Sequence, residues 1–135
     1  MTCWIHIISL MLYWAHPDYR NVARLNELSR IASATCEACN DDTHESVTLT
    51  SIASYESGFR IHALGRLGEI GPWQLRYLSS KTSLNRQARE ALHRVHLSLS
   101  YCGDLRWYAS GTCTMGSEAS AKRMARAKEW EELEL

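Results

Sequence analysis

Apolar residues recur every three or four positions along most of this 135-residue chain, which is the spacing of amphipathic helices. Residues 3–15 are apolar nearly throughout and end at His16-Pro17, so we expect a first core helix there. A second helix is predicted from about Tyr19 to Ala38, with one face formed by Val22, Leu25, Leu28, Ile31 and Ala32. No segment alternates as a strand does, although residues 69–75 (EIGPWQL) have room for one short strand.

Capping signals place the helices that follow. Asp42 precedes Glu45 by three residues, the spacing of a capping box, and predicts a helix from about Thr43 to Gly58. Another helix is predicted over residues 83–102, stopped by Gly103, with one face formed by Ala88, Leu92, Val95 and Leu99. A short piece around residues 104–109 should end at Gly111, and a last helix contains Ala121, Met124, Ala125 and Lys128.

Evenly spaced glycines interrupt the helical pattern in the middle of the chain. Gly65, Gly68 and Gly71 mark an irregular connection, and the following Pro72 suits the first turn of a helix. No repeat, low-complexity linker or shift in composition divides the sequence. We therefore predict a mainly α-helical single domain over residues 1–135, with at most a short β segment.

The charges cancel overall but are unevenly distributed. Residues 60–106 carry eight Lys and Arg against three acidic residues, a net charge of +5, and the last seven residues (EWEELEL) carry four glutamates. The basic residues are not interleaved with aromatic ones, and no helix-turn-helix pattern is recognisable. We therefore expect solvated helix faces and no nucleic-acid partner.

The apolar N-terminal stretch is too short to span a bilayer as a helix. It also lacks the basic region and the small-residue cleavage site of a signal peptide. We expect no stable membrane insertion, so an activity outside the cytoplasm would require another route of delivery.

The five cysteines are an odd number, so at least one is free or pairs between chains. Cys36 and Cys39 have the spacing of a zinc or redox motif, but no second such pair exists and only His44 lies close by. Buried thiols or an incidental pair are the favoured interpretation. Cys102 and Cys113 flank a short segment and could form a disulfide, which their spacing alone leaves open.

One carboxylate falls on a predicted apolar helix face. Glu56 lies seven residues after Leu49 and shares its face with Ile52 and Ala53. Burial and the C-terminal end of the helix dipole both disfavour a charged carboxylate, so the pKa of Glu56 should be raised. A carboxyl group that stays protonated near neutral pH can act as a general acid. The alternative is a structural glutamate that reaches solvent or pairs with Arg60.

Three short motifs follow one another from this point. They are Glu56-Ser57, then Gly68-Glu69-Ile70-Gly71 with Gln74 after it, and finally WYASG from Trp107 to Gly111. In this order they resemble the motifs of the soluble-lytic-transglycosylase family of the goose-type lysozyme-like superfamily, and phage-type members in particular. That family has a Glu-Ser pair, a G-x-x-G segment followed by a glutamine, and a Y-N-x-G sequence. The resemblance covers about Thr48 to Gly111.

The resemblance implies a lysozyme-like helical fold and cleavage of peptidoglycan between N-acetylmuramic acid and N-acetylglucosamine, without a metal or other cofactor. Glu56 would protonate the glycosidic oxygen and then take the proton of the muramyl C6 hydroxyl, which closes an anhydro ring. Tyr108 would hydrogen-bond Glu56 or the substrate. Ser57 and Gln74 would hold acetamido or peptide groups of the glycan strand.

Some positions depart from the family pattern. Ala109 replaces the usual asparagine, which would remove one hydrogen bond near the substrate, and Pro72-Trp73 replaces Leu-Met. Glu69 stands where many members have alanine. It would either raise the pKa of Glu56 by repulsion or face water as a loop residue, and we favour the second interpretation.

The resemblance also implies where the protein acts, which would be the periplasm or cell wall. Because no signal-peptide features are recognisable, we expect delivery by a phage virion or holin, or by a secretion apparatus. Further partners would be other phage lysis or virion proteins. Two alternatives stay open: a lysozyme-type hydrolase with Glu69 or Asp104 as second carboxylate, and a non-catalytic cell-wall-binding or virion protein.

Overall fold

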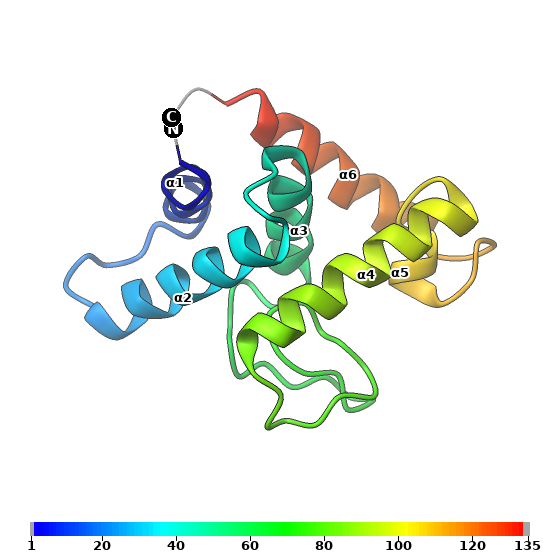
Figure 1. The fold of residues 1–135 in the computed structure, drawn as a ribbon, viewed down its shortest axis with the longest axis horizontal. Coiled ribbons are helices and arrows are strands. Elements are labelled where there is room, and N and C mark those ends of the chain that lie inside the picture. Colours follow the sequence, from blue (N-terminus) through cyan, green and yellow to red (C-terminus); the bar gives the residue numbers. More distant parts are fainter. Residues whose placement is uncertain (1, 134–135) are drawn as a thin grey trace.

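The computed structural model describes residues 2–133, and its regular structure is almost entirely helical. Six helices follow one another along this part of the chain (Figure 1). They are α1 (Cys3–Ala15), α2 (Val22–Ala38), α3 (Thr43–Glu56), α4 (Leu84–Cys102), α5 (Arg106–Ser110) and α6 (Ser117–Glu131). The predicted mainly helical class is therefore confirmed.

Helix α3 is the centre of the core. It packs against α1, α2, α4 and α6, and it is buried on nearly all sides from Ser46 to Ser54 (Figure 1). The Asp42 side chain caps its N-terminus by accepting a hydrogen bond from the Glu45 N–H at 2.8 Å, as the capping signal predicted. The buried hydroxyl of Thr50 donates back to Ser46 O, so small polar residues are tolerated inside the core.

The buried faces of the other helices differ in part from the predicted ones. Helix α2 begins at Val22, which is capped by Asn21 and left 72% exposed at the helix start, so its predicted place in the core is wrong. On α4, Ala88 and Val95 of the predicted face are buried, whereas Leu99 near the helix end is 41% exposed. Single exposed apolar residues carry little cost, so patterns near helix ends are weak guides.

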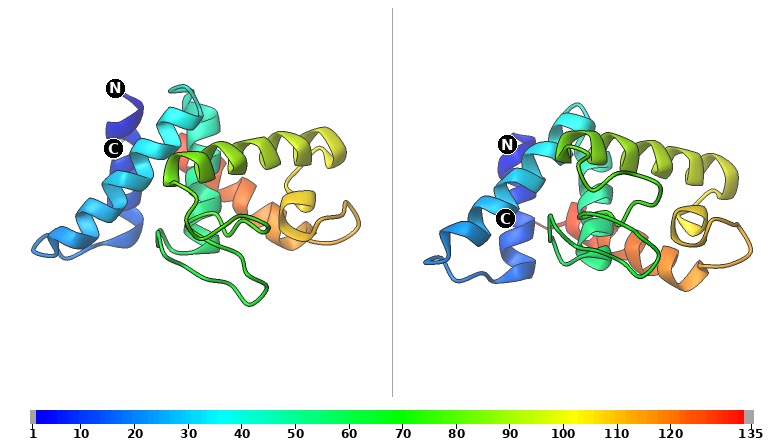
Figure 2. Two further views of the ribbon diagram at one scale, coloured as in Figure 1. Left: turned by 60° about the horizontal axis from the view of Figure 1, so that its bottom comes forward. Right: turned by 90° about the horizontal axis from the view of Figure 1, so that it is seen from below.

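Residues 57–83 form the irregular connection that the glycines predicted, and this segment covers one end of α3 and α4 (Figures 1 and 2). Two isolated antiparallel bridges, Leu64 with Ile70 and Ile70 with Leu75, are the short β segment. Pro72 lies in a turn and does not begin a helix, so that expectation is wrong. The fully buried Trp73 next to it donates from Nε1 to Leu49 O at 3.1 Å and thereby attaches the loop to α3.

Two disulfides link separate segments of the chain. Cys3 of α1 is bonded to Cys36 of α2, and Cys102 at the end of α4 is bonded to Cys113 in the loop before α6. Cys39 is the free cysteine and is buried. The Cys36-x-x-Cys39 pair is thus neither a zinc nor a redox motif, because its first sulfur is bonded to Cys3.

Across residues 2–133, none of the helices has both the length and the apolar character needed to cross a bilayer.

Candidate active site

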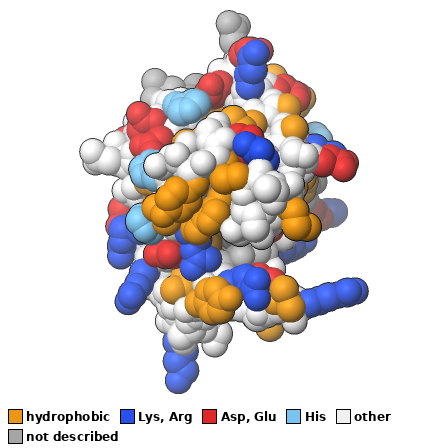
Figure 3. All heavy atoms as spheres, turned by 90° about the vertical axis from the view of Figure 1, so that its right-hand side faces the viewer, with side chains coloured by type: hydrophobic (Ala, Val, Ile, Leu, Met, Phe, Trp, Pro, Cys, Tyr) orange, Lys and Arg blue, Asp and Glu red, His pale blue; other side chains and the backbone are white. Residues whose placement is uncertain are grey.

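A cleft of about 850 Å³ opens between the 67–77 part of the connecting segment, α4 and α5, and the end of α3 forms one of its walls. Figure 3 views the molecule from this side, where hydrophobic side chains gather above a hollow and charged ones stand at its edge. Its lining includes four of the residues singled out in the sequence: Glu56, Glu69, Gln74 and Tyr108. Segments far apart in the sequence thus bring three motifs to one cavity.

Glu56 is the last residue of α3, where the helix leaves the core and meets the cleft. Its side chain is 21% exposed, and Oε1 accepts a hydrogen bond from Arg123 Nη2 of α6 at 2.9 Å. Arg60, the partner expected from sequence proximity, pairs with Glu27 instead. The structure therefore corrects the expected ion pair and assigns it to a residue 67 positions further along the chain.

The pKa of Glu56 is raised above that of an ordinary glutamate, as its place on the buried face predicted. Burial is the main cause, because it penalises the charged carboxylate. Arg123 opposes this effect through its charge and its hydrogen bond, and the neighbouring Glu69 carboxylate adds to the rise. The pKa of Glu56 is thus shifted in the direction that general-acid catalysis by a carboxyl group requires.

Glu69 and Gln74 lie together on the loop side of the cleft. Glu69 Oε2 accepts a hydrogen bond from the Leu67 N–H at 3.1 Å, and Gln74 Nε2 donates to Gly71 O at 3.0 Å. Gly65 is necessary for this arrangement, since a Cβ there would lie 1.8 Å from Glu69 Oε2 and 2.7 Å from Gln74 Oε1. Glu69 thus lines the same cleft as Glu56, and its charge helps to raise the pKa of Glu56, which is the alternative to the favoured expectation of a loop residue facing water.

Tyr108 lies on α5 opposite the loop. Its hydroxyl donates to Trp73 O at 2.9 Å, so the hydrogen bond to Glu56 that the resemblance implied is not made in this structure. Burial, followed by the negative charge of Glu56, raises the pKa of Tyr108, so its hydroxyl keeps its proton. Tyr108 therefore connects the loop to α5 and also lines the cleft.

Ser57 and Asp104 lie outside the cleft lining. The Ser57 hydroxyl donates to Ala53 O and accepts from the Arg60 N–H at 3.1 Å, so it caps the end of α3. Asp104 Oδ1 accepts a hydrogen bond from Arg106 Nε at 2.9 Å and so contacts the first residue of α5. Of the two carboxylates considered as a second acidic group, only Glu69 shares the cleft with Glu56.

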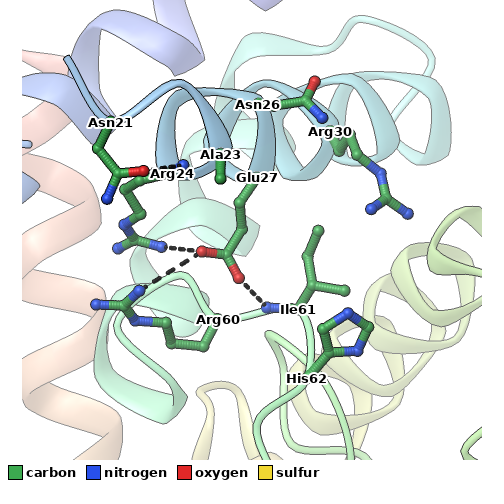
Figure 4. A pocket seen from close by; sticks show the side chains of 9 residues that line it. All are labelled: Asn21, Ala23, Arg24, Asn26, Glu27, Arg30, Arg60, Ile61 and His62. Atoms are coloured by element: carbon green, nitrogen blue, oxygen red, sulfur yellow. Dashed lines mark hydrogen bonds and ion pairs between the residues drawn. The ribbon is translucent and has the colours of Figure 1, made fainter. Parts of the chain in front are cut away.

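Side chains of α2 form hydrogen bonds with the turn that follows Glu56, beside a smaller pocket of about 340 Å³ (Figure 4). Arg24 Nη2 donates to Gly58 O at 2.9 Å, and Glu27 Oε2 accepts from the Ile61 N–H at 2.9 Å. Burial pushes the pKa of Glu27 upward, but the Ile61 N–H and the Arg24 guanidinium outweigh it and lower the pKa. This ion pair fixes the backbone directly behind the acid.

Two arginines that line the cleft, Arg76 and Arg94, carry no signal in the sequence, and Arg94 Nη2 donates to Arg76 O at 2.7 Å. Trp107, the first residue of the third motif, also lines the cleft. Arg123, which bonds to Glu56 from α6, was not predicted either. The three arginines belong to no motif, so only the packing of the chain brings them to the site.

Among the described residues, potential metal ligands come together only at Cys3, Cys36 and Asp41, where the two sulfurs are joined in a disulfide. This group lies on α1 and α2 and in the turn after α2, and none of its residues lines the cleft.

Compared with known protein families, with curated proteins and with solved structures, the chain matches none. An assignment of function therefore rests on the motifs in the sequence and on the geometry of the cleft.

Proposed function

We propose that this protein is a peptidoglycan lytic transglycosylase with a goose-type lysozyme-like fold. The observation that carries the proposal is the half-buried carboxyl of Glu56, which has a raised pKa and lies in the wall of an open cleft of about 850 Å³. Clefts of this size can bury most of the surface of a small-molecule ligand. Glu69, Gln74 and Tyr108 line the same cleft.

In the proposed reaction, Glu56 gives its proton to the glycosidic oxygen as the bond to the muramyl C1 breaks. The substrate's own N-acetyl oxygen stabilises the positive charge that develops, as in substrate-assisted glycosidases. The Glu56 carboxylate then takes the proton of the C6 hydroxyl, whose oxygen bonds to C1. The product is an anhydro-muramyl end, no water is consumed, and Glu56 regains its proton.

The disulfides support a place of action outside the reducing cytoplasm, because such bonds persist in oxidising compartments. The proposed setting is the periplasm or cell wall, reached through a phage virion, a holin or a secretion apparatus. Glycan strands are the proposed binding partner, alongside other lysis or virion proteins.

A lysozyme-type hydrolase is the second candidate, and the position of Glu69 favours it. A second carboxylate in the cleft with the acid is the arrangement that activates water in two-carboxylate glycosidases. The two candidates share Glu56 as the acid and differ in the group that attacks C1.

Mass spectrometry of muropeptides distinguishes these functions. Purified peptidoglycan is digested with the wild type and with Glu56→Gln, with Glu118→Gln on the exposed start of α6 as a charge-matched control. We expect anhydro-muramyl products from the wild type and the control, and a loss of at least about 100-fold in Glu56→Gln. Reducing muramic acid ends would instead identify a hydrolase. No product from any enzyme, on walls of several bacteria, would leave a non-catalytic wall-binding or virion protein.

A further inference from the structure

Two charges of opposite sign approach the Glu56 carboxyl from different elements. Arg123 of α6 donates to Oε1 at 2.9 Å, and Glu69 of the connecting segment lines the same cleft. The side chain of Arg123 is 13% exposed and that of Glu56 is 21% exposed. Water and salt therefore screen this pair much less than an ion pair at the surface.

Arg123 is held in a fixed position by α6 and α3. Its Nη1 donates to Ala119 O one turn earlier at 2.9 Å, and its guanidinium lies 5.0 Å from the centre of the Tyr55 ring. Its buried Nε has no partner among the described residues. The guanidinium is thus anchored by its own helix and by an aromatic ring, and its remaining Nη2 is directed at the acid.

We infer that Arg123 is a positioning residue for Glu56, and that Arg123 and Glu69 together set the pH at which Glu56 gives up its proton. This inference rests on the proposed role of Glu56 as the acid. Burial alone would make Glu56 a weak acid that holds its proton tightly, and Glu69 strengthens that effect through like-charge repulsion. Arg123 works in the opposite direction, because it stabilises the carboxylate that remains once the proton has moved to the glycosidic oxygen.

Other charged groups near Glu56 are engaged elsewhere. On α4, Arg94 pairs with Glu90 at 3.1 Å, and on α5 the Tyr108 hydroxyl donates to Trp73 O. On α6, Arg126 bonds to the Ser54 hydroxyl and stacks on the Tyr55 ring at 3.8 Å. Within residues 2–133, Arg123 is therefore the cation that is ion-paired with Glu56.

The test is a titration of the Glu56 carboxyl by NMR with ¹³C-labelled glutamate, assigned by the signal missing in Glu56→Gln. We expect Arg123→Gln to move the Glu56 midpoint to higher pH and Glu69→Gln to move it to lower pH, each by about one pH unit. Lys122→Gln and Glu118→Gln are matched controls, because they remove the same charges from α6 at an exposed pair and should leave the midpoint unchanged.

Muropeptide release measured against pH gives the second readout. A general acid must begin protonated, so activity falls as pH rises through its midpoint. This falling limb should move to higher pH in Arg123→Gln and to lower pH in Glu69→Gln, and the double variant should return it toward the wild-type position. Arg123→Lys keeps the charge and should shift the falling limb less than Arg123→Gln does. If Arg123→Gln fails to fold, Arg123→Lys and Glu69→Gln still test the inference.

Unchanged midpoints in both variants, or shifts in the same direction, would overturn the inference. If the wild type releases anhydro products while the Glu56 titration midpoint is the same in both variants, the proposed function is supported and the role inferred for Arg123 and Glu69 is rejected. If the midpoints shift as expected but no enzyme releases product, the charge pair is established and the proposed function fails.

Discussion

At the residue scale, the position of Glu56 determines both its pKa and its ion-pair partner. The sequence placed Glu56 on a buried helix face, and this was sufficient to predict the direction of its pKa change. It did not provide the partner, since Arg60 lies close in sequence but pairs with Glu27. An ion pair depends on where the charged end of a side chain lies in space, and α6 brings the Arg123 guanidinium to 2.9 Å from the Glu56 carboxylate.

Gly65 provides a residue-scale prediction. Gly65→Ala would place a methyl group within 1.8 Å of Glu69 Oε2, so Glu69 and Gln74 must move while the backbone stays in place. We expect cleavage to fall about tenfold or more, because small displacements of site groups are costly, with only a small change in melting temperature.

Gly103→Ala serves as the control for Gly65→Ala. Gly103 ends α4 at φ 75°, and a methyl group added there would meet no other atom within 4 Å. Strain at this positive φ should therefore lower stability by about 1 kcal/mol and leave cleavage intact. Rates of muropeptide release and thermal melting of both variants test this. A Gly65→Ala enzyme as active as Gly103→Ala would contradict the role given to Gly65.

At the scale of elements, the short helix α5 depends on its surroundings. Five residues cannot form a stable helix alone, so packing and covalent closure must hold it. The Cys102–Cys113 disulfide joins the segments on both sides of α5, and Arg106 Nη2 donates to Cys102 O at 3.0 Å. These contacts hold Trp107 and Tyr108 at the cleft.

Removal of each disulfide should therefore have a different effect on activity. Replacing Cys102 and Cys113 by serine should cost about 3 kcal/mol of unfolding free energy and reduce cleavage, because α5 loosens. Replacing Cys3 and Cys36 should cost about 4 kcal/mol by the same reasoning and leave cleavage largely intact at low temperature, since α1 and α2 do not line the cleft. Denaturant unfolding and cleavage rates of the two double variants check this, and equal losses of activity would contradict it.

For the molecule as a whole, the raised pKa of Glu56 makes the free energy of unfolding depend on pH. Its folded-state pKa is raised above 4.5, so between pH 4.5 and the folded-state pKa the folded protein binds more protons than the unfolded chain. The stability that Glu56 contributes is complete below pH 4.5 and is lost as pH rises through its folded-state pKa. Above that pKa the ionised group is a net cost to the fold.

Glu56→Gln should therefore melt at a higher temperature than the wild type at neutral pH, by roughly one to a few degrees. The glutamine oxygen can still accept the hydrogen bond from Arg123. The difference should shrink as pH falls and vanish below the unfolded-state pKa. Melting curves across this pH range test the sign, and a variant that is less stable than the wild type at neutral pH would contradict the linkage argument.

The sequence by itself determined the mainly helical class, the Asp42 and Gly103 caps, the glycine-rich connection and the direction of the Glu56 pKa. These features depend on periodicity and on local backbone chemistry, which involve only residues close together in the sequence. The tertiary structure decided that Cys3 bonds Cys36, that Tyr108 donates to Trp73, that Arg123 bonds Glu56, and that Glu69 lines the same cleft as Glu56. These arrangements join residues distant in sequence, and only the packing of the chain around α3 brings them together.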